Sequence, residues 1–348
     1  MIKPLLHQIQ RRLPLRLKKT IKALLWQVLP WKSNERTKPL VRLFHQPYNV
    51  PRRCDELTFN IPGEQSTLTY SANYCLNNNP WQPVHSGAPR YPNPQFCLEF
   101  FHKDLCVGKN VLIIEAKAPF GRTHKIEYQF NYSQHQGQPQ DCIWKESSVL
   151  EVEDGYWETA SIDGEWRVRP VPGYEGYDKV LLLSEPFEGG RRVETNMILR
   201  KIIPAKEWGY GILPQWGGRP DPEGTLPRRG WLFSLVWYFN RYKGYGAEFS
   251  ERQGNNIAKF NTCYRSSNIE LLRKYSVITE CLDERDAKNK HIRYVLRFKW
   301  WPSDEAEPED WIFLDDKSGW KLPERAYAIG LVCYNCQVDF GPMYIKRC

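Results

Sequence analysis

The side chains best suited to chemistry are a tyrosine and several cations that recur at alternate positions of three segments. Tyr238 is a candidate general base. Arg293, Arg297 and Lys299 suit carboxylate or sulfate groups, because a guanidinium group pairs bidentately with a planar carboxylate. Such a face would bind an acidic glycan. It would cleave the glycan if the cations neutralise a uronate carboxylate of the glycan while the tyrosine abstracts the neighbouring proton. The predicted ligand-binding face also contains Glu194, Asn196, Arg200, Ser234 and Asn240.

The segment that carries the tyrosine, residues 230–240, alternates with period two and predicts a β-strand. Its odd-numbered residues from Trp231 to Phe239 are apolar and should face a core, while the tyrosine lies on the other side. The same alternation in residues 192–203 and 291–301 places the cations on one side of each strand. In the latter segment Ile292, Tyr294, Leu296, Phe298 and Trp300 are expected to face inward. We therefore expect three strands to share one polar surface.

Short alternating runs continue along most of the chain and predict an all-β protein. Further strands are expected within residues 57–74, 96–101, 110–116, 125–132, 154–158, 164–168, 177–182, 209–216, 259–265, 268–274, 326–332 and 336–346, with a loop at 77–94. Their spacing predicts a small β-sandwich followed by a large two-sheet sandwich. The expected organisation is a tail and linker at 1–53, a small domain at 54–138 and a large domain at 141–348.

One hairpin in the small domain resembles the immunoglobulin-like modules of proteins associated with extracellular polysaccharide. It is the sequence LCVGKNVLIIEAKAPFGRTHKIEYQF, residues 105–130, with a turn of the type G-x-N before a strand that ends in alanine. The resemblance implies a spacer, and we assign no site to this domain.

The large domain resembles the concanavalin A-like lectin and glucanase superfamily, in its laminin-G-like branches. The resemblance rests on residues 176–187, 230–239, 293–301 and 327–346, where the last segment is similar to the closing hairpin of that superfamily. It implies a jelly roll whose concave sheet often carries a glycan site. The glucanase carboxylate arrays E-x-D-x-x-E and E-x-D-x-E are absent, and Glu165, Glu194 and Glu248 have no second carboxylate at an alternate position of the same predicted strand for a retaining pair.

Two functions from different classes follow. The first is a non-catalytic carbohydrate-binding or surface-interaction protein, and the second is a polysaccharide lyase or another glycan-active enzyme such as a glycoside hydrolase. We expect binding rather than catalysis. A solvated cationic surface is the alternative for the predicted face, and core packing is the alternative to sugar stacking for five aromatic residues. These are Trp208, Tyr210, Trp216, Tyr242 and Tyr245.

No cofactor is identified, no metal ligands are assigned, and a calcium requirement stays open. The ten cysteines include one CxxC, Cys333 and Cys336, without the second pair that a structural zinc site needs. Buried thiols are therefore expected. The motifs GxxxxGK[ST], GxGxxG after a strand, HExxH and G-x-S-x-G are absent.

The basic charge is concentrated in the tail. Residues 1–53 hold 13 Lys and Arg against the single Glu35, whereas the rest holds 36 Lys and Arg against 39 Asp and Glu. A nearly neutral body argues against specific nucleic-acid binding. Residues 14–29 predict a basic amphipathic helix, and residues 1–31 could bind an anionic membrane surface, with a solvated or partner-bound helix as the alternative. With no clear signal peptide or membrane span, a cytoplasmic or peripheral membrane location is expected rather than secretion.

Overall fold

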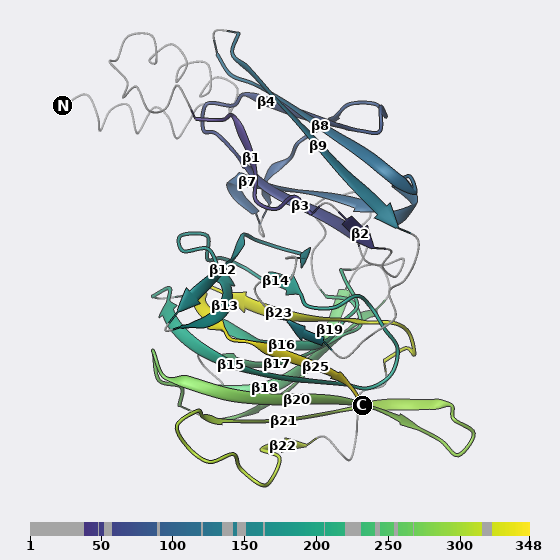
Figure 1. The fold of residues 1–348 in the computed structure, drawn as a ribbon, viewed down its shortest axis with the longest axis vertical. Coiled ribbons are helices and arrows are strands. Elements are labelled where there is room, and N and C mark those ends of the chain that lie inside the picture. Colours follow the sequence, from purple (N-terminus) through teal and green to yellow (C-terminus); the bar gives the residue numbers. More distant parts are fainter. Residues whose placement is uncertain are drawn as a thin grey trace, which may run out of the picture.

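The computed structural model describes residues 38–47, 49–51, 58–88, 91–119, 121–133, 142–144, 151–162, 164–204, 206–219, 231–240, 244–253, 257–266, 268–314 and 322–348. Within these residues the chain is all-β, apart from one turn of 3-10 helix, η1 (His102–Asp104). The strands form two units that lie one above the other (Figure 1). The predicted amphipathic helix at 14–29 lies outside the described residues. None of the helices in the described part is long and apolar enough to cross a membrane.

The first unit consists of two sheets. Sheet I has the order β1-β3-β7-β6, and sheet II has the order β2-β9-β8-β4-β5, in which β2 runs parallel to β9. The strands are β1 (Val41–Leu43), β2 (Asn49–Pro51), β3 (Thr58–Gln65), β4 (Ser71–Leu76), β5 (Gln82–Pro83), β6 (Ser86–Ala88), β7 (Tyr91–Phe101), β8 (Gly108–Lys117) and β9 (Thr123–Ser133). Apolar side chains from both sheets, including Ile61, Phe96, Leu112, Ile114 and Phe130, form a shared core.

One sheet of the second unit, sheet III, has the order β12-β13-β24-β15-β20-β21-β22, with β25 pairing β15 and β10. Its strands are β10 (Cys142–Trp144), β12 (Trp157–Ile162), β13 (Glu165–Pro170), β15 (Arg191–Ile202), β20 (Lys274–Arg285), β21 (His291–Pro302), β22 (Phe313–Leu314), β24 (Cys336–Phe340) and β25 (Met343–Arg347).

The facing sheet, sheet IV, has the order β11-β14-β23-β16-β17-β18-β19. Its strands are β11 (Glu151–Val152), β14 (Lys179–Leu182), β16 (Gly209–Trp216), β17 (Ser234–Asn240), β18 (Gly244–Gln253), β19 (Ile257–Arg265) and β23 (Ala328–Tyr334). Sheets III and IV make the second unit a large two-sheet β-sandwich, as the spacing of the strands predicts.

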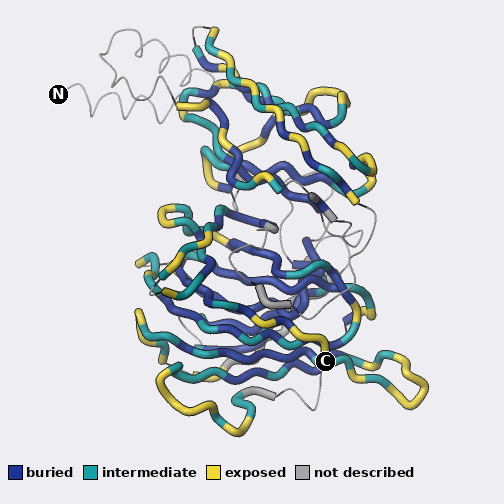
Figure 2. The backbone as a smooth tube through the Cα atoms, in the orientation of Figure 1, coloured by how far each residue is buried: buried dark blue, intermediate teal, exposed yellow. Residues whose placement is uncertain are grey.

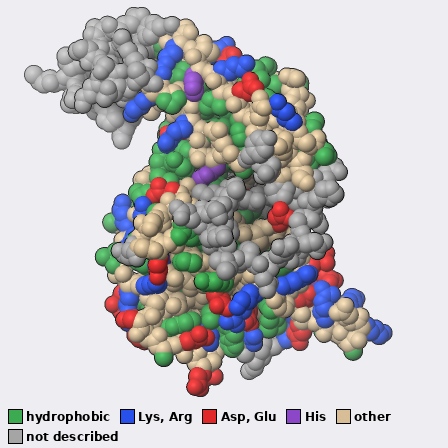
Figure 3. Space-filling model, viewed as in Figure 1, with side chains coloured by type: hydrophobic (Ala, Val, Ile, Leu, Met, Phe, Trp, Pro, Cys, Tyr) green, Lys and Arg blue, Asp and Glu red, His purple; other side chains and the backbone are tan. Residues whose placement is uncertain are grey.

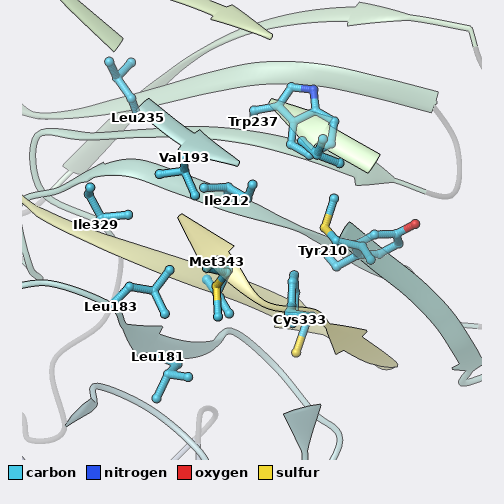
Figure 4. Close-up of a cluster of buried hydrophobic side chains, with 14 of the residues drawn as sticks. Leu181, Leu183, Val193, Tyr210, Ile212, Leu235, Trp237, Ile329, Cys333 and Met343 are labelled. Atoms are coloured by element: carbon cyan, nitrogen blue, oxygen red, sulfur yellow. The ribbon is translucent and has the colours of Figure 1, made fainter. Parts of the chain in front are cut away.

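The main core fills the space between sheets III and IV. Leu235 and Trp237 of β17 approach it from one sheet, and Val193 and Met343 approach it from the other (Figure 4). The ring centroids of Trp237 and Phe298 lie 4.8 Å apart across this space. The strands are buried along most of their length, and exposure is concentrated in the turns (Figure 2).

The predicted inward alternation of β21 is confirmed for Tyr294, Leu296 and Phe298, which are fully buried. Two residues depart from the alternation. Ile292 is 48% exposed, because it lies at the hairpin end of β21 beyond the facing sheet. Trp231 belongs to a smaller apolar cluster on the other face of sheet IV. The left-handed backbone of Phe233 (φ 48°) interrupts the period-two pattern just before β17 begins, and this reverses the direction of Trp231.

Five other segments differ from expectation. The predicted linker contains β1 and β2, and the predicted loop at 77–94 contains β5, β6 and the start of β7. The predicted strand at 268–274 is a turn, because Leu272 is left-handed (φ 66°) and β20 begins only at Lys274. The sequence reading included neither β18 nor β20, although β20 lies in the middle of sheet III.

Candidate functional site

The structure does not bring the predicted ligand-binding face together. Glu194, Asn196 and Arg200 on β15 and the three cations on β21 belong to sheet III, whereas Ser234, Tyr238 and Asn240 on β17 belong to sheet IV. The inward side chains of both sheets share one core. Their outward side chains therefore point away from each other, on opposite sides of the sandwich. The single predicted surface is corrected to two surfaces, because strand alternation gives the face of a strand but not the sheet to which it belongs.

The cations of sheet III are engaged by neighbouring carboxylates. Arg297 donates to Glu280 at 2.6 Å, and its guanidinium group lies 4.4 Å from the ring centroid of Trp311. Lys299 pairs with Glu307 at 2.5 Å and donates to the carbonyl of Pro308 at 2.9 Å.

The remaining residues of this predicted face have similar partners. Arg293 pairs with Glu284, and Arg200 pairs with the buried Asp339. Asn196 accepts a hydrogen bond from Arg167 at 2.6 Å.

Partial burial raises the pKa of Glu194, but the charges of Arg192 and Lys346 outweigh this effect and lower the pKa overall. Lys and Arg lie beside Asp and Glu over this unit in Figure 3. The arrangement fits the alternative of a solvated surface, on which the cations form ion pairs with neighbouring carboxylates.

Sheet IV carries a cavity on its outer face. It encloses about 200 Å³ at one end of β16, β17 and β23. Its lining combines aromatic rings with carboxylates: Tyr177, Asp178, Glu207, Gly209, Tyr210, Trp231, Tyr238, Glu248, Val332 and Tyr334. We call this cavity the sheet IV pocket.

Several elements position these side chains. Tyr238 and Glu248 lie on the adjacent strands β17 and β18, so the tyrosine hydroxyl donates a hydrogen bond to the carboxylate. Tyr334 ends β23 directly opposite Gly209, the first residue of β16. A Cβ atom at position 209 would lie 2.4 Å from the ring of Tyr334, so only glycine leaves room for that ring.

Two further contacts hold the walls of the pocket. The indole N–H of Trp231 donates to Asp178 Oδ2 at 3.3 Å, and the Asn240 amide donates to the hydroxyl of Tyr334 at 3.3 Å. Burial raises the pKa of Tyr210 well above its usual value, so this phenol stays neutral. Tyr177 is 55% exposed and lies at the entrance, where an incoming ring could stack on it.

The charge of the sheet IV pocket is opposite to the charge predicted for the site. Three carboxylates, Asp178, Glu207 and Glu248, line it, and the described lining residues include no Lys, Arg or His. In the described part of the chain, no group of three or more His, Cys, Asp and Glu is close enough to hold a metal ion. The carboxylates are therefore distributed around the pocket and do not converge on one point.

Of the residues predicted for the site, only Tyr238 lines this pocket, and Asn240 supports it through Tyr334. Ser234 is buried and accepts a hydrogen bond from the backbone of Gly217. The sequence reading did not identify Tyr177, Asp178, Glu207, Trp231 or Tyr334, because turns and strand ends show no periodicity. In the sequence, Glu248 is an isolated carboxylate.

Four of the five aromatic residues named above pack in or against apolar cores, which fits the alternative to sugar stacking. Tyr210 and Tyr245 pack in the main core, Trp208 packs against that core, and Trp216 is buried in the cluster on the other face of sheet IV. Tyr210 also lines the pocket. Tyr242 lies outside the described residues.

Cys333 and Cys336 are buried in the main core, as expected, and burial raises the pKa of both thiols above the usual range.

Comparison with known proteins gives only remote likenesses. No family model matches the sequence, and no curated protein matches it. The potassium-bound carbohydrate recognition domain of Emp46p is similar with a TM-score of 0.35 and 11% identity, over 57% of this chain and 87% of that chain. A protein of unknown function with a galectin-like fold from Bacillus subtilis gives a TM-score of 0.30 and 8% identity, over 57% and 89% of the two chains. At these TM-scores the likenesses carry no argument about function.

Proposed function

We propose that the chain is a non-catalytic carbohydrate-binding protein that holds its ligand in the sheet IV pocket. The observation that carries this proposal is the convergence of aromatic rings and hydrogen-bonding groups on one cavity at the end of three strands. Sugars combine flat apolar C–H surfaces with hydroxyl groups, so they suit sites in which rings stack and carboxylates accept hydrogen bonds.

The charge of the pocket bears on which glycan it takes. Asp178, Glu207 and Glu248 would repel an acidic polysaccharide, which is the ligand that the sequence suggested. The cations that were expected to attract such a polymer lie on the opposite side of the sandwich and face carboxylates. We therefore propose a ligand without carboxylate or sulfate groups.

A polysaccharide lyase is not supported by the same geometry. A lyase needs a cation that neutralises the uronate carboxylate beside the abstracted proton. The described lining of the sheet IV pocket contains carboxylates and no such cation. Tyr238, the candidate base, donates its proton to Glu248 in a hydrogen bond. Binding is therefore the function that we retain.

We further propose the finer fold assignments that the sequence suggested. The order of sheets III and IV supports a concanavalin A-like jelly roll for residues 141–348. The four strands of sheet I facing the five of sheet II support an immunoglobulin-like spacer for the first unit. The pairing of β1 with β3 extends that unit into the range assigned to the tail.

Isothermal titration of the full chain with glycans chosen from an array screen, with and without calcium, tests the binding. Tyr177→Ala is expected to weaken binding about two- to tenfold, because aromatic contacts are worth about 0.5–1.5 kcal/mol. Tyr344→Ala is the matched control, since Tyr344 is 44% exposed on the outer side of sheet III, and Tyr177 is 55% exposed. Equal affinities for the two variants, or no bound glycan at all, would contradict the proposal.

A further inference from the structure

The sheet IV pocket combines two features that both favour a positively charged ligand. Three acidic side chains line it, and aromatic residues supply most of the remaining lining. Carboxylates attract a cation directly, and the face of an aromatic ring attracts it through the ring quadrupole.

The carboxylates reach the pocket from separate parts of sheet IV. Asp178 precedes β14, Glu207 precedes β16, and Glu248 lies within β18. Glu207 is exposed at the rim. The hydroxyl of Tyr238 donates to Glu248 and the indole N–H of Trp231 donates to Asp178, and these hydrogen bonds orient the two carboxylates.

The distribution of these groups favours an organic cation over a metal ion. A divalent metal ion needs several oxygen ligands that converge on one point, and no such group occurs in the described part of the chain. An ammonium group carried on a ring can instead contact a carboxylate on one side while the ring stacks on Tyr177 or Trp231. The pocket, at about 200 Å³, is smaller than the 300–1,000 Å³ usual for drug-sized ligands, so it admits one small ring or head group.

We propose that the ligand is a glycan with free amino groups, in which a protonated 2-amino-2-deoxy sugar enters the sheet IV pocket. The inference rests on the proposed carbohydrate-binding function and specifies its ligand class. The amino group faces the carboxylates, the sugar ring packs on the aromatic residues, and the hydroxyl groups donate to the remaining carboxylate oxygens. The N-acetylated form of the same sugar lacks the charge and should bind less tightly.

The test compares three sets of oligosaccharides of equal length on the full chain: glucosamine oligomers, their N-acetylated forms and neutral glucose oligomers. We expect the free-amine oligomer to bind at least tenfold more tightly than the other two in slightly acidic buffer. The preference should shrink in alkaline buffer and at high salt, because deprotonation removes the charge and salt screens it.

Glu207→Gln is the diagnostic variant, because it removes one charge from an exposed position on the pocket rim. It should reduce affinity for the free-amine oligomer severalfold and leave affinity for the neutral oligomer unchanged. Glu309→Gln is the control, since Glu309 is exposed in the turn after β21, on the other sheet.

Three outcomes would overturn the inference. Tyr177-dependent binding with no preference for the free amine would overturn it and leave the proposed function in place. Equal losses in the Glu207→Gln and Glu309→Gln variants would show general charge attraction and also overturn it. The absence of binding to every oligosaccharide would overturn both proposals.

Discussion

The guanidinium group of Arg219 and the carboxylate of Asp154 form an ion pair in which the two side chains are 0% and 1% exposed. Arg219 Nε lies 3.0 Å from Asp154 Oδ2, and the hydroxyl of Tyr91 donates to the other carboxylate oxygen at 2.7 Å. Tyr91 belongs to β7 of the first unit, whereas Asp154 follows β11 and Arg219 follows β16 in the second. This buried cluster therefore joins the two units.

Asp154→Asn should destabilise the protein by about 3–5 kcal/mol, because it leaves the charge of Arg219 buried without its carboxylate. Tyr91→Phe removes only one hydrogen bond to the same carboxylate and should cost about 1.5–3 kcal/mol. Urea unfolding of the full chain measures both values. If Asp154→Asn lowers the free energy of unfolding no more than Tyr91→Phe does, the ion pair is not the main stabilising contact of this junction.

His45 should make the stability of this junction dependent on pH. The backbone N–H of Trp157 donates to His45 Nε2 at 3.1 Å, which requires that nitrogen to be unprotonated. Burial lowers the pKa of His45 to about 4 from its usual 6.5. The ring of Tyr156 lies 5.6 Å away, and Arg42, which donates to Glu64 and to Tyr174, lies beside that ring.

Because the pKa of His45 is lower in the folded chain, its contribution is complete above about pH 6.5 and is lost as the pH falls through about 4. The loss is expected to reach roughly 3 kcal/mol, since one pKa unit corresponds to about 1.4 kcal/mol. Unfolding measured along this pH range in wild type and His45→Gln, which keeps an acceptor that does not titrate, isolates the effect. The same acid dependence in both proteins would rule out His45 as its cause.

Phe298 and Arg297 are neighbours on β21 with opposite roles. Phe298 is fully buried against Trp237, so Phe298→Ala should leave a cavity and cost about 3–5 kcal/mol. Arg297→Ala removes a partly exposed ion pair worth about 1 kcal/mol, and Arg192 still pairs with Glu280. Thermal and urea unfolding compare the two variants. A larger loss for Arg297→Ala would mean that the register of β21 is shifted by one residue.

The sequence predicts the strands of this protein better than it predicts their arrangement. The alternation of β17 and β21 shows which of their side chains face the core, because burial of one face imposes period two. The sequence does not predict β20, because Ile278 and Leu282 are apolar residues on its outer side and interrupt the alternation of polar and apolar residues. Ion-pairing side chains such as Glu280 lie on the same side. Its other side, with Val277, Thr279 and Cys281, is buried.

The candidate site could be predicted from the sequence only in part. Tyr238 is visible as a polar residue on an apolar strand, but its neighbours Tyr177 and Glu207 come from turns far along the chain. Alternation gives no information about which strands share a sheet, so the predicted face combines β15 and β21 with β17, although β17 lies in the opposite sheet. The prediction of an acidic ligand depends on that grouping, and the ligand that we propose for the sheet IV pocket has the opposite charge.

The last prediction concerns the basic N-terminal segment. Leu40, Val41 and Val50 are buried in the core of the first unit. Deleting residues 1–53 should therefore destabilise that unit by several kcal/mol, since burying each such side chain is worth about 1.5–3 kcal/mol. Deleting residues 1–37 removes most of the Lys and Arg residues of the segment 1–53 and none of these core residues. It should leave the free energy of unfolding unchanged.

The shorter deletion also tests the proposed membrane contact of residues 1–31. The full chain is expected to co-sediment with vesicles that contain anionic lipid, because each basic residue near such a surface contributes about 1 kcal/mol. Binding should weaken as salt is added and should disappear in the chain that lacks residues 1–37. Neutral vesicles are the control. Equal co-sedimentation of the full and shortened chains would place any membrane contact on the folded body.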